Sequence, residues 1–367
     1  MDKHPTIGRF APSPTGPLHL GSLYTALAGF LQARSRQGLW LLRIDDLDTP
    51  RNVKGSVDTI LKTLETFGLH WDGSVYYQSR HIDIYNDAIN DLQSNKLIYP
   101  CTCSRKTLTT SDRAQASPDI YPGICRDRQT SSDNNVDLSG AKPSPEGEGR
   151  VTTARMQEVE PRREQLPRGN QNKEKSLFVS PLPEGEGAYV LKSTVLTPSD
   201  IPYALRIKAD NRIIVFQDEL QGLISHNLAE QDGDFIVKRK DGIIAYQFAV
   251  VIDDDLQQVN HIVRGFDLLE ATPKQIYLQQ LLGLSTPGYM HVPVIVDEQG
   301  YKLSKQTRAT AVDLNSPHRV IFELLMLLKQ APPIELQHAP VAEQLDWAIE
   351  HWNPGVLKNT HTVSFFK

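Results

Sequence analysis

The feature of this sequence that most constrains its fold is a proline- and glycine-rich loop between two apolar segments. Residues 7–11 have the pattern of a short strand, and from Ser22 to Ala33 apolar residues recur at helical spacing. Leu39–Ile44 is a dense apolar run that ends in Asp45-Asp46-Leu47-Asp48, as expected of a buried parallel strand. A strand, a stiff loop, a helix and a second strand in this order predict an α/β fold with a parallel sheet.

Later segments continue this alternation. Helical patterns cover Val57 to Leu64, stopped by Gly68, and Tyr85 to Leu92. We interpret Ala245–Ile252 as another apolar strand that ends in Asp253-Asp254-Asp255, followed by a short strand at His261–Arg264. A last helix in this part begins at Pro273 and is closed by Gly283.

Length, charge and hydropathy bound the class of protein. The 367 residues are enough for two or three domains. No apolar run reaches the roughly 18 residues of a membrane span, and the first five residues lack the apolar core of a secretory signal. We therefore expect a cytoplasmic protein with no membrane partner. The formal net charge of −5 gives no global basic footprint, so a nucleic-acid partner would need a local contact or a shaped pocket.

Residues 126–202 differ in composition from the rest of the chain. They are rich in Ser, Pro, Gly, Glu, Asn and Arg, and their only aromatic residues are Phe178 and Tyr189. Such a segment buries too little apolar surface to offset the entropy of ordering. It also nearly repeats itself at 142–149 and 180–187. We predict a low-complexity, disordered insertion in a surface loop.

The three cysteines are clustered as Cys101-x-Cys103 and Cys125. An odd number of cysteines in a reducing compartment favours metal ligation over disulfides. Tetrahedral zinc needs four ligands, and the chain has no fourth cysteine. The nearest histidine upstream is His81. Three buried or free thiols are the alternative interpretation.

Two distant motifs have the residue types of a phosphate site. His19 can donate hydrogen bonds to a phosphoryl oxygen, and Gly21 lets the backbone approach a nucleotide at a helix N-terminus. In Lys302-Leu303-Ser304-Lys305-Gln306, two lysines three residues apart could neutralise a departing pyrophosphate. Each motif alone is more often structural, as a loop histidine or a solvated basic loop. Together they indicate an enzyme that splits ATP, with Mg²⁺, between its α and β phosphates.

At these motifs the sequence resembles a known family. Arg9 to Ser22 resembles the HIGH motif of class I aminoacyl-tRNA synthetases in their glutamyl form, and Lys302–Gln306 resembles their KMSKS loop. With its cysteine cluster, the chain is most similar to glutamyl-queuosine tRNA(Asp) synthetases over roughly residues 5–125 and 203–350. The resemblance implies a Rossmann-like, nucleotide-binding catalytic domain, an inserted zinc-containing, acceptor-binding-like subdomain, a short helical C-terminal region and no anticodon-binding domain.

The resemblance also implies a role for particular residues. The catalytic set is His19, Gly21, Lys302 and Lys305, and the ATP-binding set is His19, Gly21, Ser22 and Lys305. The glutamate-binding set is Arg9, Ala11, Ser13, Asp45, Tyr246 and Arg264, and one structural zinc ion is held by Cys101, Cys103, Tyr121 and Cys125. Asp45 stands where the family commonly has Glu, so the carboxylate expected to meet the substrate ammonium is one methylene shorter.

The expected domains follow from these assignments. They are the first half of the catalytic domain (1–98), the zinc knuckle (99–125), the insertion (126–202), the rest of the inserted subdomain with the second half of the catalytic domain (203–310), and a helical C-terminal region (311–367). In the last region, helical patterns cover Arg319 to Lys329 and Glu343 to Trp352.

The implied reaction has two steps. L-glutamate is activated by ATP as glutamyl adenylate and then transferred to queuosine in the anticodon of tRNA(Asp) by a monomeric ligase. The 62 residues after Lys305 are too few for a long anticodon-binding region, which fits an acceptor in the anticodon. Two alternatives remain: a truncated glutamyl-tRNA synthetase that charges the tRNA 3′ end, and a non-catalytic tRNA-binding paralogue.

Overall fold

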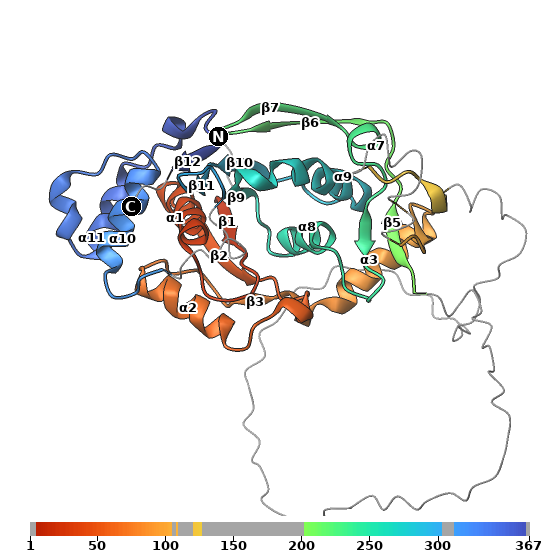
Figure 1. Cartoon of the computed structure of the whole chain (residues 1–367), viewed down its shortest axis with the longest axis horizontal. Helices are drawn as coiled ribbons and strands as arrows, with labels where there is room; N and C mark the ends of the chain where they lie inside the picture. Colours follow the sequence, from red (N-terminus) through yellow and green to blue (C-terminus); the bar gives the residue numbers. More distant parts are fainter. Residues whose placement is uncertain (1–4, 105–107, 109–119, 127–201, 303–311, 365–367) are drawn as a thin grey trace, which may run out of the picture. The chain divides into compact units, whose positions relative to one another are not determined.

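The computed structural model describes residues 5–104, 108, 120–126, 202–302 and 312–364. Residues 1–131 and 201–367 belong to one compact unit, drawn in Figure 1 with the chain coloured along its length. The predicted disordered insertion lies outside the described residues, apart from Arg126 and Pro202 at its two ends.

The N-terminal unit is a parallel strand–helix–strand arrangement, as predicted. β1 (Ile7–Phe10) is followed by α1 (Leu20–Ser35) and β2 (Leu39–Ile44), and β1 and β2 pair in parallel with Ile7 opposite Leu39. The short β3 (Tyr76–Tyr77) extends this sheet in parallel beside β2. The strand, helix and strand expected from residues 7–44 are confirmed.

A second sheet continues this layer. Its order is β7 (Gly222–Asn227), β6 (Ile213–Asp218), β10 (Gly288–Val292) and β9 (His261–Gly265). β9, β10 and β6 are parallel, whereas β6 and β7 form an antiparallel hairpin. β9 lies beside β1, where the Asn260 backbone N–H donates to Ile7 O at 3.1 Å. The strand predicted at 261–264 is confirmed.

Both faces of this layer are covered by apolar side chains. Leu42 and Val263 belong to one core cluster with α1 and the C-terminal helices, whereas their neighbours Leu41 and Ile262 pack in another. Successive strand residues point to opposite faces, so each strand contributes to both clusters. This explains why Leu39–Ile44 is a continuous apolar run rather than an alternating one.

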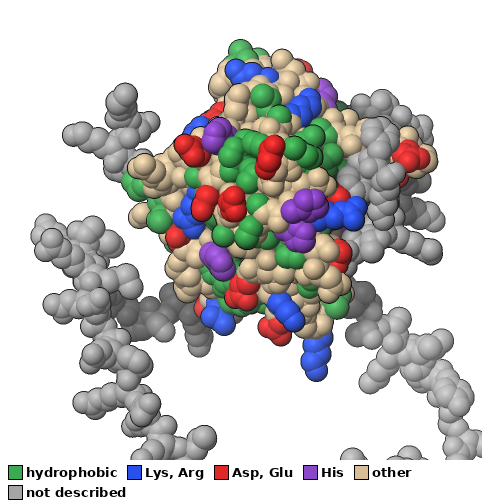
Figure 2. Space-filling view, turned by 90° about the vertical axis from the view of Figure 1, so that its left-hand side faces the viewer, with side chains coloured by type: hydrophobic (Ala, Val, Ile, Leu, Met, Phe, Trp, Pro, Cys, Tyr) green, Lys and Arg blue, Asp and Glu red, His purple; other side chains and the backbone are tan. Residues whose placement is uncertain are grey.

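The predicted helices form close to the expected positions. They are α2 (Ser56–Thr66), α3 (Ile82–Ser94), α9 (Thr272–Leu282), α10 (Pro317–Leu327) and α11 (Val341–Glu350). Gly283 ends α9 in the left-handed conformation, with φ +68°, which glycine adopts without steric cost. α11 packs against α1 and α10, as Figure 1 shows. Figure 2 shows that the surface on this side mixes apolar, acidic, basic and histidine side chains.

One predicted strand is wrong. Residues 246–256 form helix α8 (Tyr246–Leu256), not a strand that ends at Asp253. Seven successive residues from Phe248 to Asp254 are buried in this helix. A helix buried on all sides loses the polar face that would reveal its period, so a short apolar run does not distinguish it from a buried strand.

A third, antiparallel sheet contains β4 (Ile98–Cys101), β5 (Ala204–Ile207) and β8 (Ile236–Lys238) in that order. Cys101 lies opposite Ala204. The segment 102–203 therefore begins and ends at neighbouring positions. A segment with this geometry can change in length without displacing the strands on either side.

Short elements complete the described fold. They are α7 (Leu228–Gln231), the parallel pair β11 (Val294–Val296) and β12 (Thr362–Ser364), and the 3₁₀ helices η1 (Thr49–Arg51), η2 (Gln78–Arg80), η4 (Phe266–Ala271), η6 (Ile334–His338) and η7 (Pro354–Leu357). Among the described helices, none has both the length and the apolar character needed to cross a bilayer.

Candidate active site

A cavity of about 320 Å³ opens where the ends of β1 and β9 meet the N-terminus of α1. Its size is within the range of small-molecule sites. Most of the predicted site residues line it together: Arg9, Ala11, Ser13, His19, Gly21, Ser22, Tyr246, Arg264 and Lys302. Asp45 lines a neighbouring cavity. Lys305 lies outside the described residues.

The loop that leads into α1 is fixed by hydrogen bonds to the adjacent segments. Gly16 has φ +131°, a conformation that favours glycine. The Ser56 hydroxyl donates to Gly16 O at 2.8 Å and accepts from Gly16 N–H at 2.9 Å. Asp45 N–H donates to Pro12 O at 3.1 Å. These bonds hold the cavity wall formed by residues 11–18 in one position.

His19 caps α1 with its side chain. Its Nδ1 accepts from Ser22 N–H at 3.2 Å, and its Nε2 lies 3.0 Å from Ser22 Oγ. Because Nδ1 is an acceptor here, a neutral imidazole carries its proton on Nε2. The first turn of α1 contains no acidic residue. The helix N-terminus at the cavity is thus suited to an anion.

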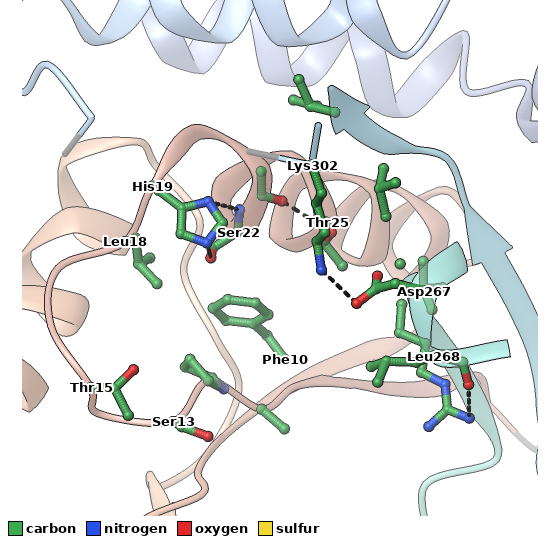
Figure 3. A pocket seen from close by; sticks show the side chains of 18 of the residues that line it. Phe10, Ser13, Thr15, Leu18, His19, Ser22, Thr25, Asp267, Leu268 and Lys302 are labelled. Atoms are coloured by element: carbon green, nitrogen blue, oxygen red, sulfur yellow. Dashed lines mark hydrogen bonds and ion pairs between the residues drawn. The ribbon is translucent and has the colours of Figure 1, made fainter. Parts of the chain in front are cut away.

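Lys302 reaches the cavity from the segment that follows β11. Its Nζ donates to Asp267 Oδ2 at 2.5 Å, and both side chains are partly exposed. Figure 3 shows this pair on the side of the cavity opposite His19, with Phe10 between them. The arrangement brings a cation and a helix N-terminus to two sides of one space, although His19 and Lys302 are far apart in the sequence.

One wall of the cavity contains a buried cluster of charges. Arg9 Nε and Nη2 donate to the two carboxylate oxygens of Asp254 at 3.1 and 3.4 Å. Arg43 Nη1 donates to Asp254 Oδ1 at 2.6 Å, and Arg43 Nε donates to Asp45 Oδ1 at 2.8 Å. Asp253 accepts hydrogen bonds from the hydroxyls of Tyr76 and Tyr85. Buried ions persist when they are paired in this way.

Two of the carboxylates next to Arg43, Asp254 and Asp45, differ in their electrostatics. Although burial raises the pKa of Asp254, Arg9 and Arg43 hold it below its ordinary value of 3.8. Burial raises the pKa of Asp45 to about 6, against the opposing effect of Arg43. Asp45 Oδ2 is also buried without a hydrogen-bond partner. A buried acceptor of this kind is costly unless something binds it.

Arg264, on the opposite wall, is held by uncharged groups. Its Nε donates to His291 Nε2 at 3.0 Å, its Nη1 to Gln275 Oε1 at 2.7 Å and its Nη2 to Thr272 Oγ1 at 2.7 Å. Nη2 also lies 3.4 Å from Leu268 O, a contact drawn in Figure 3. The side chain is almost fully buried. Its guanidinium therefore has one fixed orientation at the cavity.

A second cavity of about 350 Å³ adjoins the first, because Ser13 and Tyr246 line both. Tyr246 is the first residue of α8, and its side chain is 40% exposed. Asp45 and Gln78 line the second cavity, together with Asp48, Arg51 and Arg239.

The three cysteines come together as predicted. The sulfur atoms of Cys101, Cys103 and Cys125 all lie within 4.8 Å of one another. The Tyr121 hydroxyl lies 3.4 Å from Cys101 Sγ and 3.7 Å from Cys103 Sγ, and accepts from Cys125 N–H at 3.0 Å. His81 stacks on Tyr76 instead. Three thiols and one phenol oxygen around one point are a donor set that fits zinc.

Hydrogen bonds also affect the readiness of these thiols to ionise. Burial alone would raise the pKa of Cys125. Hydrogen bonds from the Thr102 backbone and Cys103 outweigh this effect and lower the pKa to about 7. Burial raises the pKa of Cys103 to about 11. The Arg206 guanidinium lies 3.8 Å from the centre of the Tyr121 ring. Metal binding requires the thiolate form, and a bound cation favours it.

Sequence reasoning missed four residues that shape the cavity. Asp267 pairs with Lys302, Asp254 pairs with Arg9, and His291 and Asp218 lie behind Arg264. A usable signal existed for Asp254: it belongs to an acidic triplet that directly follows an apolar run, and a buried carboxylate needs a buried cation. His291 is an isolated polar residue in an apolar strand, and Asp218 is one of three successive polar residues at a strand end, so neither gave such a signal.

Comparison with known proteins adds independent observations. A model of the family "tRNA synthetases class I (E and Q), catalytic domain" matches residues 6–166 and 161–328. The "Glutamyl-Q tRNA(Asp) synthetase" of Methylococcus capsulatus is 40% identical over 354 residues, which cover 96% of this chain and 93% of that protein. The protein of the same name from Thiobacillus denitrificans is 39% identical over 353 residues, or 96% and 95% of the two chains.

Solved structures show the same fold. A glutamate tRNA ligase from Elizabethkingia meningosepticum, in complex with its amino acid, has a TM-score of 0.67 at 23% identity. The match covers 99% of this chain and 67% of that one. A glutamate-tRNA synthetase from Elizabethkingia anophelis has a TM-score of 0.68 at 23% identity, with 99% and 68% covered.

Proposed function

Because this chain belongs to the glutamyl-Q tRNA(Asp) synthetase family, we propose that it activates L-glutamate with ATP and transfers it to queuosine in the anticodon of tRNA(Asp). It is a ligase of the class I synthetase type, and its α/β catalytic fold matches the expectation from the sequence. The observation that best supports the proposal is the single cavity that joins the α1 N-terminus, Lys302, Arg9 and Arg264.

The first step is adenylate formation. The α-carboxylate of glutamate attacks the α-phosphorus of ATP; a carboxylate–phosphorus bond forms, and pyrophosphate leaves with the electrons of the broken P–O bond. The backbone N–H groups of α1 and the His19 Nε2 proton stabilise the charge on the transferring phosphoryl group. Lys302 assists the departure of pyrophosphate, together with Lys305. Mg²⁺, bound with the nucleotide, neutralises phosphate charge. Catalysis then consists of positioning and charge stabilisation, with no protein nucleophile.

The amino-acid site lies between the two arginines. Arg9 and Arg264 meet the carboxylate groups of glutamate, since a planar guanidinium fork matches a carboxylate. Asp45 receives the ammonium group, a role that its buried, unpartnered Oδ2 supports. Tyr246 and Ser13 lie where the two cavities adjoin. Ala11 also lines the first cavity.

In the second step a ring hydroxyl of queuosine attacks the carbonyl of glutamyl adenylate, an ester bond forms, and AMP leaves. The choice of acceptor is supported by the names of the relatives. The second cavity, entered past Ser13 and Tyr246, gives the acceptor a place beside the adenylate. The 3′ end of a tRNA is the alternative acceptor.

We also propose a structural zinc site at the cysteine cluster. Cys101, Cys103 and Cys125 supply thiolates, and Tyr121 supplies the fourth ligand; zinc bound there would fix the segment that follows β4. Metal analysis of the purified protein should find about one zinc per chain. Cys103→Ser should lose the metal, whereas Thr102→Ser should keep it. Equal zinc content in both variants would contradict the assignment.

The decisive assay compares acceptors. Labelled glutamate, ATP and tRNA(Asp) with or without queuosine are incubated with the protein, and the position of the label is determined. We expect transfer only to tRNA(Asp) that contains queuosine. Label on the terminal adenosine would support the truncated glutamyl-tRNA synthetase. Absence of glutamate-dependent ATP–pyrophosphate exchange would support the non-catalytic paralogue.

A further inference from the structure

A buried line of hydrogen bonds runs from Asp218 through His291 to Arg264. Asp218 Oδ2 lies 2.6 Å from His291 Nδ1, and His291 Nε2 lies 3.0 Å from Arg264 Nε. Asp218 and His291 are fully buried, and Arg264 is 3% exposed. The three residues come from β6, β10 and β9, which are adjacent in the sheet. Only Arg264 reaches the cavity.

These contacts fix the tautomer of His291. Arg264 Nε–H can only donate, so His291 Nε2 must accept and carries no proton. The proton of a neutral imidazole is then on Nδ1, where it is donated to Asp218. Asp218 is itself held by the backbone N–H groups of Leu220 and Gln221 at 3.0 and 2.9 Å. The donor and the acceptor are therefore defined in both hydrogen bonds, from Arg264 to His291 and from His291 to Asp218.

The same contacts preserve the charge of Arg264. Its partners His291, Gln275, Thr272 and Leu268 O are all uncharged. Among the described residues, no carboxylate forms an ion pair with Arg264, and Asp218 acts only through the imidazole. A guanidinium held by neutral acceptors keeps its attraction for a ligand carboxylate, which direct pairing would weaken.

We propose that His291 and Asp218 are positioning residues that hold the Arg264 guanidinium toward the carboxylate of the substrate and thereby set the affinity for glutamate. The proposal rests on the function proposed above. Asp218 selects the His291 tautomer, His291 fixes Arg264 Nε, and Arg264 binds the substrate. Neither Asp218 nor His291 touches the substrate.

Conservative variants test each link. Asp218→Asn can direct an amide N–H at His291 Nδ1, so that the imidazole proton moves to Nε2. The N–H groups of His291 Nε2 and Arg264 Nε then face each other, and no hydrogen bond forms between them. His291→Gln removes the imidazole ring that links Asp218 to Arg264. In glutamate-dependent ATP–pyrophosphate exchange, each variant should raise the KM for glutamate by about 10-fold or more. The KM for ATP should change by less than about 2-fold, because the nucleotide groups are bound by other residues.

The neighbouring strand offers a matched control. His261, on β9, has its own carboxylate partner, with Nε2 2.8 Å from Glu219 Oε1, but it does not line the cavity. His261→Gln should therefore leave both KM values unchanged. Equal rises in the two KM values, or an unchanged KM for glutamate in Asp218→Asn and His291→Gln, would overturn the proposal.

A measurement on the unmodified protein covers the case of a variant that does not fold. The ¹⁵N chemical shifts of His291 should show a neutral ring protonated at Nδ1 near pH 7. Protonation at Nε2, or at both nitrogens, would contradict the proposal. If the unmodified protein shows no glutamate-dependent exchange, the proposed function fails first; normal exchange with an Nε2–H tautomer refutes only this inference.

Discussion

The two arginines of the cavity show two ways of burying a cation beside a cavity. Arg9 is paired directly with Asp254, which also binds Arg43, so charge is compensated within the wall. Arg264 is surrounded by neutral acceptors, and the carboxylate of Asp218 contacts it only through His291. Both guanidiniums are rigid, but they differ in net local charge. Direct pairing compensates the charge of Arg9 within the protein, whereas the neutral partners of Arg264 leave its charge uncompensated.

The largest expected effect is on stability, from a change in the buried charge cluster of Arg9, Arg43 and Asp254. Asp254→Ala leaves Arg9 and Arg43 buried with too few partners, and breaking a buried ion pair in this way costs about 3–5 kcal/mol. Denaturant unfolding of the variant should show this loss. Asp210→Ala removes an exposed partner of Arg212, so its free energy of unfolding should fall by less than about 1 kcal/mol. Similar losses in both variants would show that the buried cluster is not special.

The next effect concerns the Arg264 wall. Arg264→Lys keeps one positive charge but loses the planar fork that bonds to His291, Gln275 and Thr272. We expect the KM for glutamate to rise by about 100-fold, with a smaller change in the KM for ATP. Arg36→Lys, at a half-exposed pair with Glu219 outside the cavity, is the control. A change of only a few fold would show that the fork is dispensable.

A pH profile separates Asp45 from the arginines. Burial raises its pKa to about 6, and only the ionised carboxylate attracts an ammonium group. The KM for glutamate should therefore rise by up to about 10-fold per pH unit as pH falls below about 6. Asp45→Asn should bind glutamate weakly at every pH and lack this step. A profile shared by both proteins would assign the titration to another group.

The protonation of Asp45 affects folding stability in the opposite direction from glutamate binding. Because the folded-state pKa of Asp45 lies above its ordinary value of 3.8, its stability contribution is fully present below that value and is lost as pH rises through about 6. His291 behaves in reverse. Burial lowers its pKa below 6.5, so its contribution is present above pH 6.5 and declines as pH falls toward the lowered value.

The smallest effect is expected at the ion pair between Lys302 and Asp267. Asp267→Asn removes the carboxylate beside Lys302, but both side chains are partly exposed. Such pairs contribute less than about 1 kcal/mol. The midpoint of denaturant unfolding should hardly move, in contrast to Asp254→Ala. A large loss of stability would mean that the partly exposed Lys302–Asp267 pair contributes as much as the buried Arg9–Asp254 pair.

Local pattern was enough to predict the first half of the site. The loop before α1 has few accessible conformations, because its prolines restrict it, and it places His19 at a helix N-terminus. The cysteine cluster is similarly local, since Cys101, Cys103, Tyr121 and Cys125 lie within 25 residues of one another. In the loop before α1 and in the cysteine cluster, the short separation along the sequence allows few other arrangements.

The chain by itself therefore determined the parallel strand–helix–strand unit, the position of His19 at a helix N-terminus and the cysteine cluster. Only the tertiary structure decided that residues 246–256 are helical, that Asp254 faces Arg9 and that His291 orients Arg264. Asp254 and Arg9 are separated by 245 positions. Pairings of this kind depend on which polar groups are buried together, a property of packing that no local period or spacing contains.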